Sequence, residues 1–106
     1  MKNKIVAKNS KGEFFKFIDG LWCDSKDLIE IISIPNDFIL LYCENNKLKS
    51  LPKLPYNLQE LSCEKNNIKQ LPDLRELKKL VIVWCDICCF EPYMLKMENT
   101  NFTFIC

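Results

Sequence analysis

The sequence contains no histidine and only two glycines in 106 residues. Histidine is the commonest general base at neutral pH and the commonest metal ligand, so its absence disfavours an acid–base enzyme and a histidine-ligated metal site. Two glycines disfavour a glycine-rich phosphate loop. No pair of carboxylates and no nucleophile next to a base stands out. We therefore predict that the chain is not an enzyme and that it uses no cofactor and no metal.

The sequence also lacks an excess of charge of either sign and any long hydrophobic run. Fifteen Lys and Arg residues balance 14 Asp and Glu residues, so electrostatic attraction to nucleic acid or to an anionic membrane is weak. No apolar stretch approaches the ~20 residues that span a bilayer, and the N-terminal segment lacks the apolar core of a secretory signal. Seven cysteines, an odd number, indicate reduced thiols rather than a disulfide framework. These features predict a cytoplasmic protein that binds neither nucleic acid nor membrane.

The residues that are present repeat with a period of about 20, which becomes visible when Cys43 is aligned with Cys63. The two central copies follow the pattern L-x-x-L-x-C-x-x-N-x-L-x-x-L-P-x-L, and a weaker copy lies on each side, the last one with a residue lost near Arg75. The four copies are residues 18–37, 38–57, 58–76 and 77–93. Nearly every position expected to point inward is apolar or cysteine, so the spacing carries structural information.

This pattern resembles the leucine-rich repeat family, and most closely its short repeats of about 20 residues with an L-P-x-L-P signature. Such repeats occur in bacterial effectors and in repeat proteins of giant DNA viruses. The residues that carry the resemblance are Leu41, Cys43, Asn46, Leu48, Leu51, Pro52, Leu54 and Pro55 in the second copy, and Leu61, Cys63, Asn66, Ile68, Leu71, Pro72 and Leu74 in the third. In the outer copies Lys26 and Cys85 stand where the central copies have asparagine.

The resemblance implies a strand-dominated, α/β-type solenoid: a right-handed leucine-rich repeat coil with a short parallel sheet on its concave side and a mostly irregular convex side. Within it, the side chains of Asn46 and Asn66 are expected to hydrogen-bond backbone groups of their own copy and of a neighbouring one. We also expect a monomer, and a location in the cytoplasm of the host if the protein is viral.

We expect three regions along the chain. Residues 1–17 contain two apolar segments on either side of Asn9–Gly12 and predict a capping β-hairpin. Residues 18–93 hold the four repeats. Residues 94–106 form a C-terminal cap or a truncated fifth repeat, because Phe104 and Cys106 repeat the L-x-C spacing.

Cysteines recur at a spacing of 20 residues at Cys23, Cys43 and Cys63. Parallel strands lie ~4.8 Å apart, so these thiols should stack inside the coil. We interpret them as small buried hydrophobic residues, with a metal or redox column as the alternative. The C-x-x-C sequence formed by Cys85 and Cys88 lacks a second ligand pair and is interpreted as structural in the same way.

The outward positions of the expected strands are the candidate binding face, because solenoids bind partners on their concave strands. Aromatic side chains lie there beside an acidic row, which predicts binding of a protein segment that carries Lys or Arg near an apolar anchor. The candidate binding residues are Trp22, Asp24, Leu40, Tyr42, Glu44, Glu60, Ser62, Glu64, Lys79, Val81 and Val83. The alternatives are a degenerate or truncated repeat protein with a purely structural role and a cysteine-based metal or redox protein.

Overall fold

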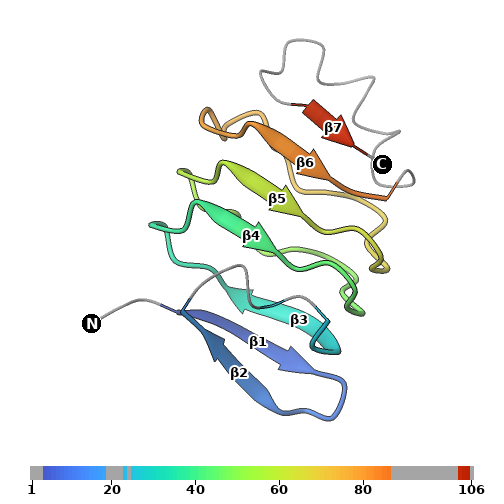
Figure 1. Ribbon diagram of the computed structural model, residues 1–106. Helices are drawn as coiled ribbons and strands as arrows, with labels where there is room; N and C mark the ends of the chain where they lie inside the picture. The colour runs from blue at the N-terminus through green and yellow to red at the C-terminus, as the bar shows by residue number, and fades with distance from the viewer. Residues whose placement is uncertain (1–3, 19–22, 24, 87–102, 106) are drawn as a thin grey trace.

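The computed structural model describes residues 4–18, 23, 25–86 and 103–105, and these contain seven β-strands in two sheets. The first sheet is antiparallel, with the strand order β2-β1-β3, and the second is parallel, with the order β4-β5-β6-β7. The strands are β1 (Ile5–Asn9), β2 (Phe14–Phe17), β3 (Leu28–Ser33), β4 (Leu40–Tyr42), β5 (Glu60–Ser62), β6 (Ile82–Trp84) and β7 (Thr103–Ile105). Figure 1 shows them stacked along the long axis of the molecule, which measures 39 × 29 × 16 Å.

Strands β1 and β2 form a hairpin over residues that the sequence analysis assigned to one. Alternate residues of β1 are buried, which places Ile5, Ala7 and Asn9 on the core side of the sheet. The buried Asn9 side chain organises the turn: its Oδ1 accepts from the backbone N–H groups of Lys11 and Glu13 at 3.1 and 2.8 Å. Gly12 has a φ of 84°, a conformation that glycine adopts without steric cost.

The parallel sheet is built by short strands whose central residues, Leu41, Leu61 and Val83, are aligned and fully buried. Each of the first two strands is followed by a turn with a residue of left-handed conformation, Asn45 at φ 59° and Lys65 at φ 58°. The chain then returns behind the sheet through the Leu-Pro segments, which cannot continue a helix because proline lacks a backbone N–H. The core is one continuous cluster that extends from Ile5 and Ala7 in the first sheet to Val83 and Cys85 in the second.

A small polar cluster joins the two sheets at the surface. Asp27 accepts a hydrogen bond from the Ser10 hydroxyl and forms a salt bridge with Lys47, with an Nζ–Oδ1 distance of 2.8 Å. Lys47 and Ser10 lower the pKa of the Asp27 carboxyl below its ordinary value. The turn of the hairpin is therefore tied to the loop that follows β4.

The prediction of a strand-dominated α/β solenoid, a right-handed coil of four leucine-rich repeats, is wrong. The part of the chain that the structure describes contains no helix, and the first expected repeat (residues 18–37) supplies an antiparallel strand instead of a coil with a parallel one. Two different sheets therefore form a compact globule in place of a closed solenoid. A parallel sheet is present, but it is only the second of the two sheets.

The physical reason lies in β3, a segment rich in leucine and isoleucine that pairs with β1. Leu28 and Ile31 are three residues apart, a spacing that a regular strand would place on opposite faces. Irregularities in the pairing with β1 leave Ile29 and Ile32 without an opposite residue, so both bulge outward while Leu28 and Ile31 are buried. The three-residue spacing of Leu28 and Ile31, which resembles that of a leucine-rich repeat, thus also fits a bulged antiparallel strand.

Residues 4–18, 23, 25–86 and 103–105 include no helix that is long and apolar enough to cross a membrane.

Candidate functional site

The candidate site is the face of the parallel sheet that points away from the core, which we call the outer face. Pairing between neighbouring strands aligns Tyr42, Ser62 and Trp84 in one column and Leu40, Glu60 and Ile82 in another. Both columns point outward because side chains alternate along a strand and the residues between them are buried. Glu44 and Glu64 follow the strands at the same edge. The outer face consists of Leu40, Tyr42, Glu44, Glu60, Ser62, Glu64, Ile82 and Trp84.

Two aromatic rings meet across the middle strand of this face. The rings of Tyr42 and Trp84 lie edge to face, with their centroids 6.1 Å apart and their planes at 84°. They come from β4 and β6, and Ser62 of β5 lies between them in the same column. Because serine is small, the two larger side chains can lean over it, and only 4% of Ser62 remains exposed. The pair therefore forms a preorganised aromatic ridge.

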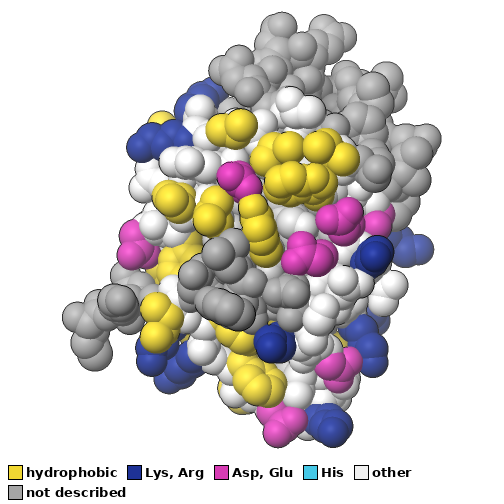
Figure 2. Space-filling model, in the orientation of Figure 1, with side chains coloured by type: hydrophobic (Ala, Val, Ile, Leu, Met, Phe, Trp, Pro, Cys, Tyr) yellow, Lys and Arg dark blue, Asp and Glu magenta, His cyan; other side chains and the backbone are white. Residues whose placement is uncertain are grey.

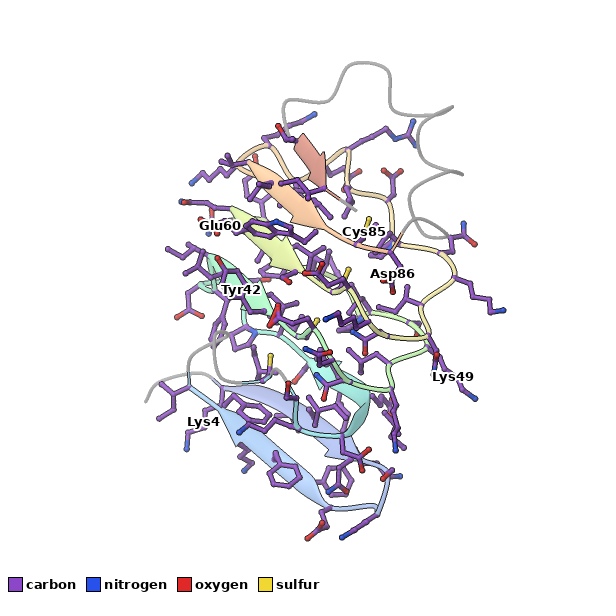
Figure 3. All side chains as sticks on the ribbon, turned by 45° about the vertical axis from the view of Figure 1, so that its right-hand side comes forward. Lys4, Tyr42, Lys49, Glu60, Cys85 and Asp86 are labelled. Carbon is purple, nitrogen blue, oxygen red and sulfur yellow. The ribbon has the colours of Figure 1, made fainter. Side chains whose placement is uncertain are left out.

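The Tyr42 hydroxyl is fixed by a carboxylate of the neighbouring strand. It donates a hydrogen bond to Oε1 of Glu60, and Figure 3 shows these two side chains on adjacent strands. This hydrogen bond, with desolvation and the charges of Glu60 and Glu44, raises the pKa of Tyr42 to about 12. Ionising the phenol would place a negative charge beside existing ones. Tyr42 thus stays a neutral donor at physiological pH.

A second set of acidic groups surrounds the Ser62 hydroxyl. Ser62 Oγ donates to Oε2 of Glu44 and lies 3.2 Å from Oε1 of Glu64. A hydroxyl has one proton and can serve one acceptor at a time, so the two carboxylates keep most of their acceptor capacity open.

No basic side chain neutralises these acids within the described part of the chain. The salt bridges there join Lys47 to Asp27 and Arg75 to Asp73, and neither includes an acid of the outer face. Figure 2 shows the same arrangement, with hydrophobic side chains gathered over β5 and β6 and acidic ones beside them. The outer face therefore combines an apolar ridge with a net negative charge.

The asparagine side chains belong to the scaffold of the face. Asn46 Oδ1 accepts from the N–H groups of Lys26 and Leu28, and its Nδ2 donates to the carbonyl groups of Cys23 and Cys43, all at 2.9 Å. These bonds connect the turn after β4 to the preceding segment and to the end of its own strand.

Asn66 acts in the same way one turn further along. It accepts from Leu48 N–H at 3.0 Å and donates to the carbonyl groups of Cys43 and Cys63 at 3.0 and 3.1 Å. Both asparagines thus bond backbone groups of their own segment and of a neighbouring one, as the sequence analysis expected.

The cysteines form part of the interior. Cys23, Cys43 and Cys63 are buried, and Cys23 donates through Sγ to the carbonyl of Tyr42 at 3.1 Å. Burial, and then the neighbouring Cys63 and Cys23, raise the pKa of Cys43 well above its ordinary value, so this thiol is not a nucleophile at neutral pH. The described residues contain no group of cysteine and acidic side chains placed to hold a metal ion.

Cys85 differs from its expected place. It was aligned with the ladder asparagines, but it follows β6 as Cys63 follows β5, and its N–H donates to Ile105 as that of Cys63 donates to Trp84. It therefore extends the cysteine column, and Figure 3 shows it beside the end of β6. Cys88 and Cys89 lie outside the described residues.

The predicted binding residues fall into three groups. Leu40, Tyr42, Glu44, Glu60, Ser62 and Glu64 lie on the outer face, whereas Trp22 and Asp24 lie outside the described residues. The predicted alignment of the fourth copy with the three earlier copies was wrong. Val83 is fully buried rather than on the face, and Lys79 lies in a turn before β6. Val81 is 59% exposed but precedes the strand.

An additional turn explains the wrong frame. The N–H of Leu77 bonds the carbonyl of Leu74, as Leu58 bonds Pro55 in the previous copy, but a second such bond from Leu80 to Leu77 follows. The added turn moves β6 along the sequence, so that Val83 rather than Leu80 is aligned with Leu61, and Trp84 rather than Val81 is aligned with Ser62.

Sequence reasoning missed Trp84 and Asp86. The signal for Trp84 is the triplet Val83-Trp84-Cys85, which matches Leu61-Ser62-Cys63 better than the triplet Leu80-Val81-Ile82 of the predicted frame does. Asp86 accepts hydrogen bonds from the backbone N–H groups of Lys65 and Asn66 at 3.0 and 3.4 Å, so it holds the turn after β5 in place.

Comparison of the chain with protein-family models, with curated proteins and with solved structures found no match. The resemblance to short leucine-rich repeats stays a prediction.

Proposed function

We propose that this chain is a non-enzymatic protein-binding module and that it binds its partner on the outer face. The partner is a protein segment that carries Lys or Arg next to an apolar side chain. The apolar side chain packs against the ridge of Tyr42 and Trp84, and the basic group approaches Glu44 and Glu64. We expect the module to act in the cytoplasm and to bind neither nucleic acid nor membrane, since this acidic face would repel phosphate groups.

The observation that supports this proposal best is the contact between Tyr42 and Trp84 beside acids that no described basic residue pairs with. Tyrosine and tryptophan dominate binding hot spots because they bury a large area and lose little conformational entropy. Here Glu60 already fixes the phenol and the two rings already touch, so binding has little side-chain motion left to restrict. The acids add selectivity and speed the approach of a basic partner.

The experiment is a selection from a displayed library of random peptides, with the purified full chain as bait. Enriched peptides should share a Lys or Arg beside an aromatic or branched aliphatic residue. Their affinity, measured by fluorescence anisotropy, should fall roughly thirtyfold or more in the Tyr42→Ala and Trp84→Ala variants, as expected for hot-spot truncation. A double Glu44→Gln, Glu64→Gln variant should weaken the salt dependence of binding.

Tyr56→Ala is the matched control, because Tyr56 is an exposed tyrosine in a turn and not on the outer face. It should leave peptide affinity unchanged. Circular dichroism must show that all variants keep the fold of the wild type. Peptides that bind with equal affinity to the wild type and to both aromatic variants would refute the proposal. A failure to enrich any peptide motif would favour a purely structural role.

A further inference from the structure

Strand β2 is an edge strand with an unusual composition. It lies at the end of the order β2-β1-β3, so no other described strand pairs with its outer edge. Three of its four residues are phenylalanine, with Phe14 64% and Phe15 37% exposed. Proteins usually protect an exposed edge with charge, proline or a covering segment, because unpaired backbone groups there can pair with another strand. Of these devices β2 has one lysine, Lys16.

The outer edges of β3 and β4 make contacts with other described residues. The carbonyl of Leu28 at the start of β3 accepts from Lys47 N–H at 2.7 Å, and that of Glu44 after β4 accepts from Ser25 N–H at 3.0 Å. Among the described residues, none outside the hairpin makes such a contact with the outer edge of β2. It is therefore an edge to which a further strand can be added.

The hydrogen bonds of the hairpin decide which backbone groups of β2 point outward. Asn9 N–H donates to the carbonyl of Glu13 at 3.0 Å. In an antiparallel pair the bonded positions alternate, so Phe15 and Phe17 direct their N–H and C=O groups toward β1. Phe14 and Lys16 direct theirs to the outer edge. These two residues are available to bond another chain.

We propose that a second copy of this chain pairs with the outer edge of β2, antiparallel and with Phe15 on the twofold axis. Phe14 of each copy then lies opposite Lys16 of the other. Both residues have outward backbone groups, so this register can form four hydrogen bonds. The two Phe15 side chains meet on one face of the joined sheet. On the other face each Lys16 ammonium lies beside a Phe14 ring.

Two observations support this register. The Phe14 ring already attracts a cation within its own chain, since Lys8 Nζ lies 5.9 Å from its centroid, so an ammonium is a favourable neighbour for it. Registers that place a neighbouring residue on the twofold axis are less favourable. With Lys16 on the axis, two ammonium groups lie opposite each other. With Phe14 on the axis, Lys16 of one copy pairs with Gly12 of the other, and the φ of 84° at Gly12 is incompatible with an extended strand.

This dimer replaces the expectation of a monomer, and it does not depend on the proposed function, because it involves the other sheet. Sedimentation velocity of the full chain over increasing concentrations should show the wild type shifting from one chain to two. Lys16→Pro removes an outward N–H from each copy while keeping the inward bonds to β1, since Lys16 makes none there. It should raise the dissociation constant of the dimer at least about tenfold, because the twofold axis repeats the substitution and each copy loses one hydrogen bond. Circular dichroism and the urea midpoint must match the wild type.

Disulfide trapping tests the register and remains informative if Lys16→Pro alters folding. Residues on the axis form a non-hydrogen-bonded pair with Cα atoms ~4.5 Å apart, within the range of a disulfide. Mild oxidation should therefore link Phe15→Cys into a covalent dimer, well above the background of the wild type and of Lys16→Cys. A wild type that stays monomeric at every concentration would overturn the proposal. Self-association that Lys16→Pro leaves unchanged, or equal cross-linking of both cysteine variants, would also overturn it.

Discussion

Replacing Asn46 with alanine should destabilise the protein more than the same replacement at Asn66. Asn46 is buried and makes four side-chain hydrogen bonds of 2.9 Å to backbone groups on both sides of the turn. Asn66 is half-buried and makes three bonds of 3.0 to 3.1 Å. The difference arises at Oδ1, which accepts from two N–H groups in Asn46 and from one in Asn66.

The expected magnitudes follow from these bonds. A hydrogen bond contributes about 0.5–1.5 kcal/mol net, and a buried group that is left unpaired costs about 1–3 kcal/mol. Four lost bonds at Asn46 therefore lower the free energy of unfolding by about 4 kcal/mol. At Asn66, fewer bonds are lost and the side chain is only half-buried, so the loss is about 2 kcal/mol. Small domains have about 5–15 kcal/mol in total, so Asn46→Ala should leave a marginally stable protein.

Urea denaturation followed by far-ultraviolet circular dichroism measures both losses. Asn46→Asp separates hydrogen bonding from packing, because it keeps the volume and the Oδ1 acceptor but places a carboxylate oxygen against the carbonyl groups of Cys23 and Cys43. It should be at least as destabilising as Asn46→Ala at neutral pH, and less so in acid, where a protonated carboxyl can donate. Equal losses at Asn46 and Asn66, or a stable Asn46→Asp variant, would refute this account of the turns.

Two further predictions concern other groups. Lys65→Asn should raise the free energy of unfolding by up to about 1 kcal/mol, because Lys65 has a left-handed φ of 58° and Asn45 already occupies the equivalent turn with a φ of 59°. Lys69→Asn should have no such effect in the same urea titration. Tyr42 should ionise near pH 12 in the folded protein, and Glu60→Gln should lower this pKa toward 10, which tyrosinate absorbance would detect as a difference from the wild type. Because the folded state favours the neutral phenol, its contribution to stability is complete below pH 10 and is lost as the pH rises through about 12.

The sequence alone determined the central part of the molecule. The alternation around Cys43 and Cys63 correctly separated inward from outward residues in β4 and β5, because burial of one sheet face requires a period of two. The asparagines were assigned to backbone hydrogen bonds, since a buried amide needs partners. Six of the residues proposed for binding lie on the outer face for the same reason.

The tertiary structure decided what local spacing could not. Leu28 and Ile31 have the spacing of a coil, yet β3 joins an antiparallel sheet, because β1 offers a long strand partner and bulges absorb the mismatch. One additional turn before β6 shifted its register, so Val83 is buried and Trp84 reaches Tyr42. Strand partners and registers depend on contacts between residues far apart in the chain. The sequence therefore determined which side chains each short segment could bury, and only the folded chain decided which segments lie next to one another.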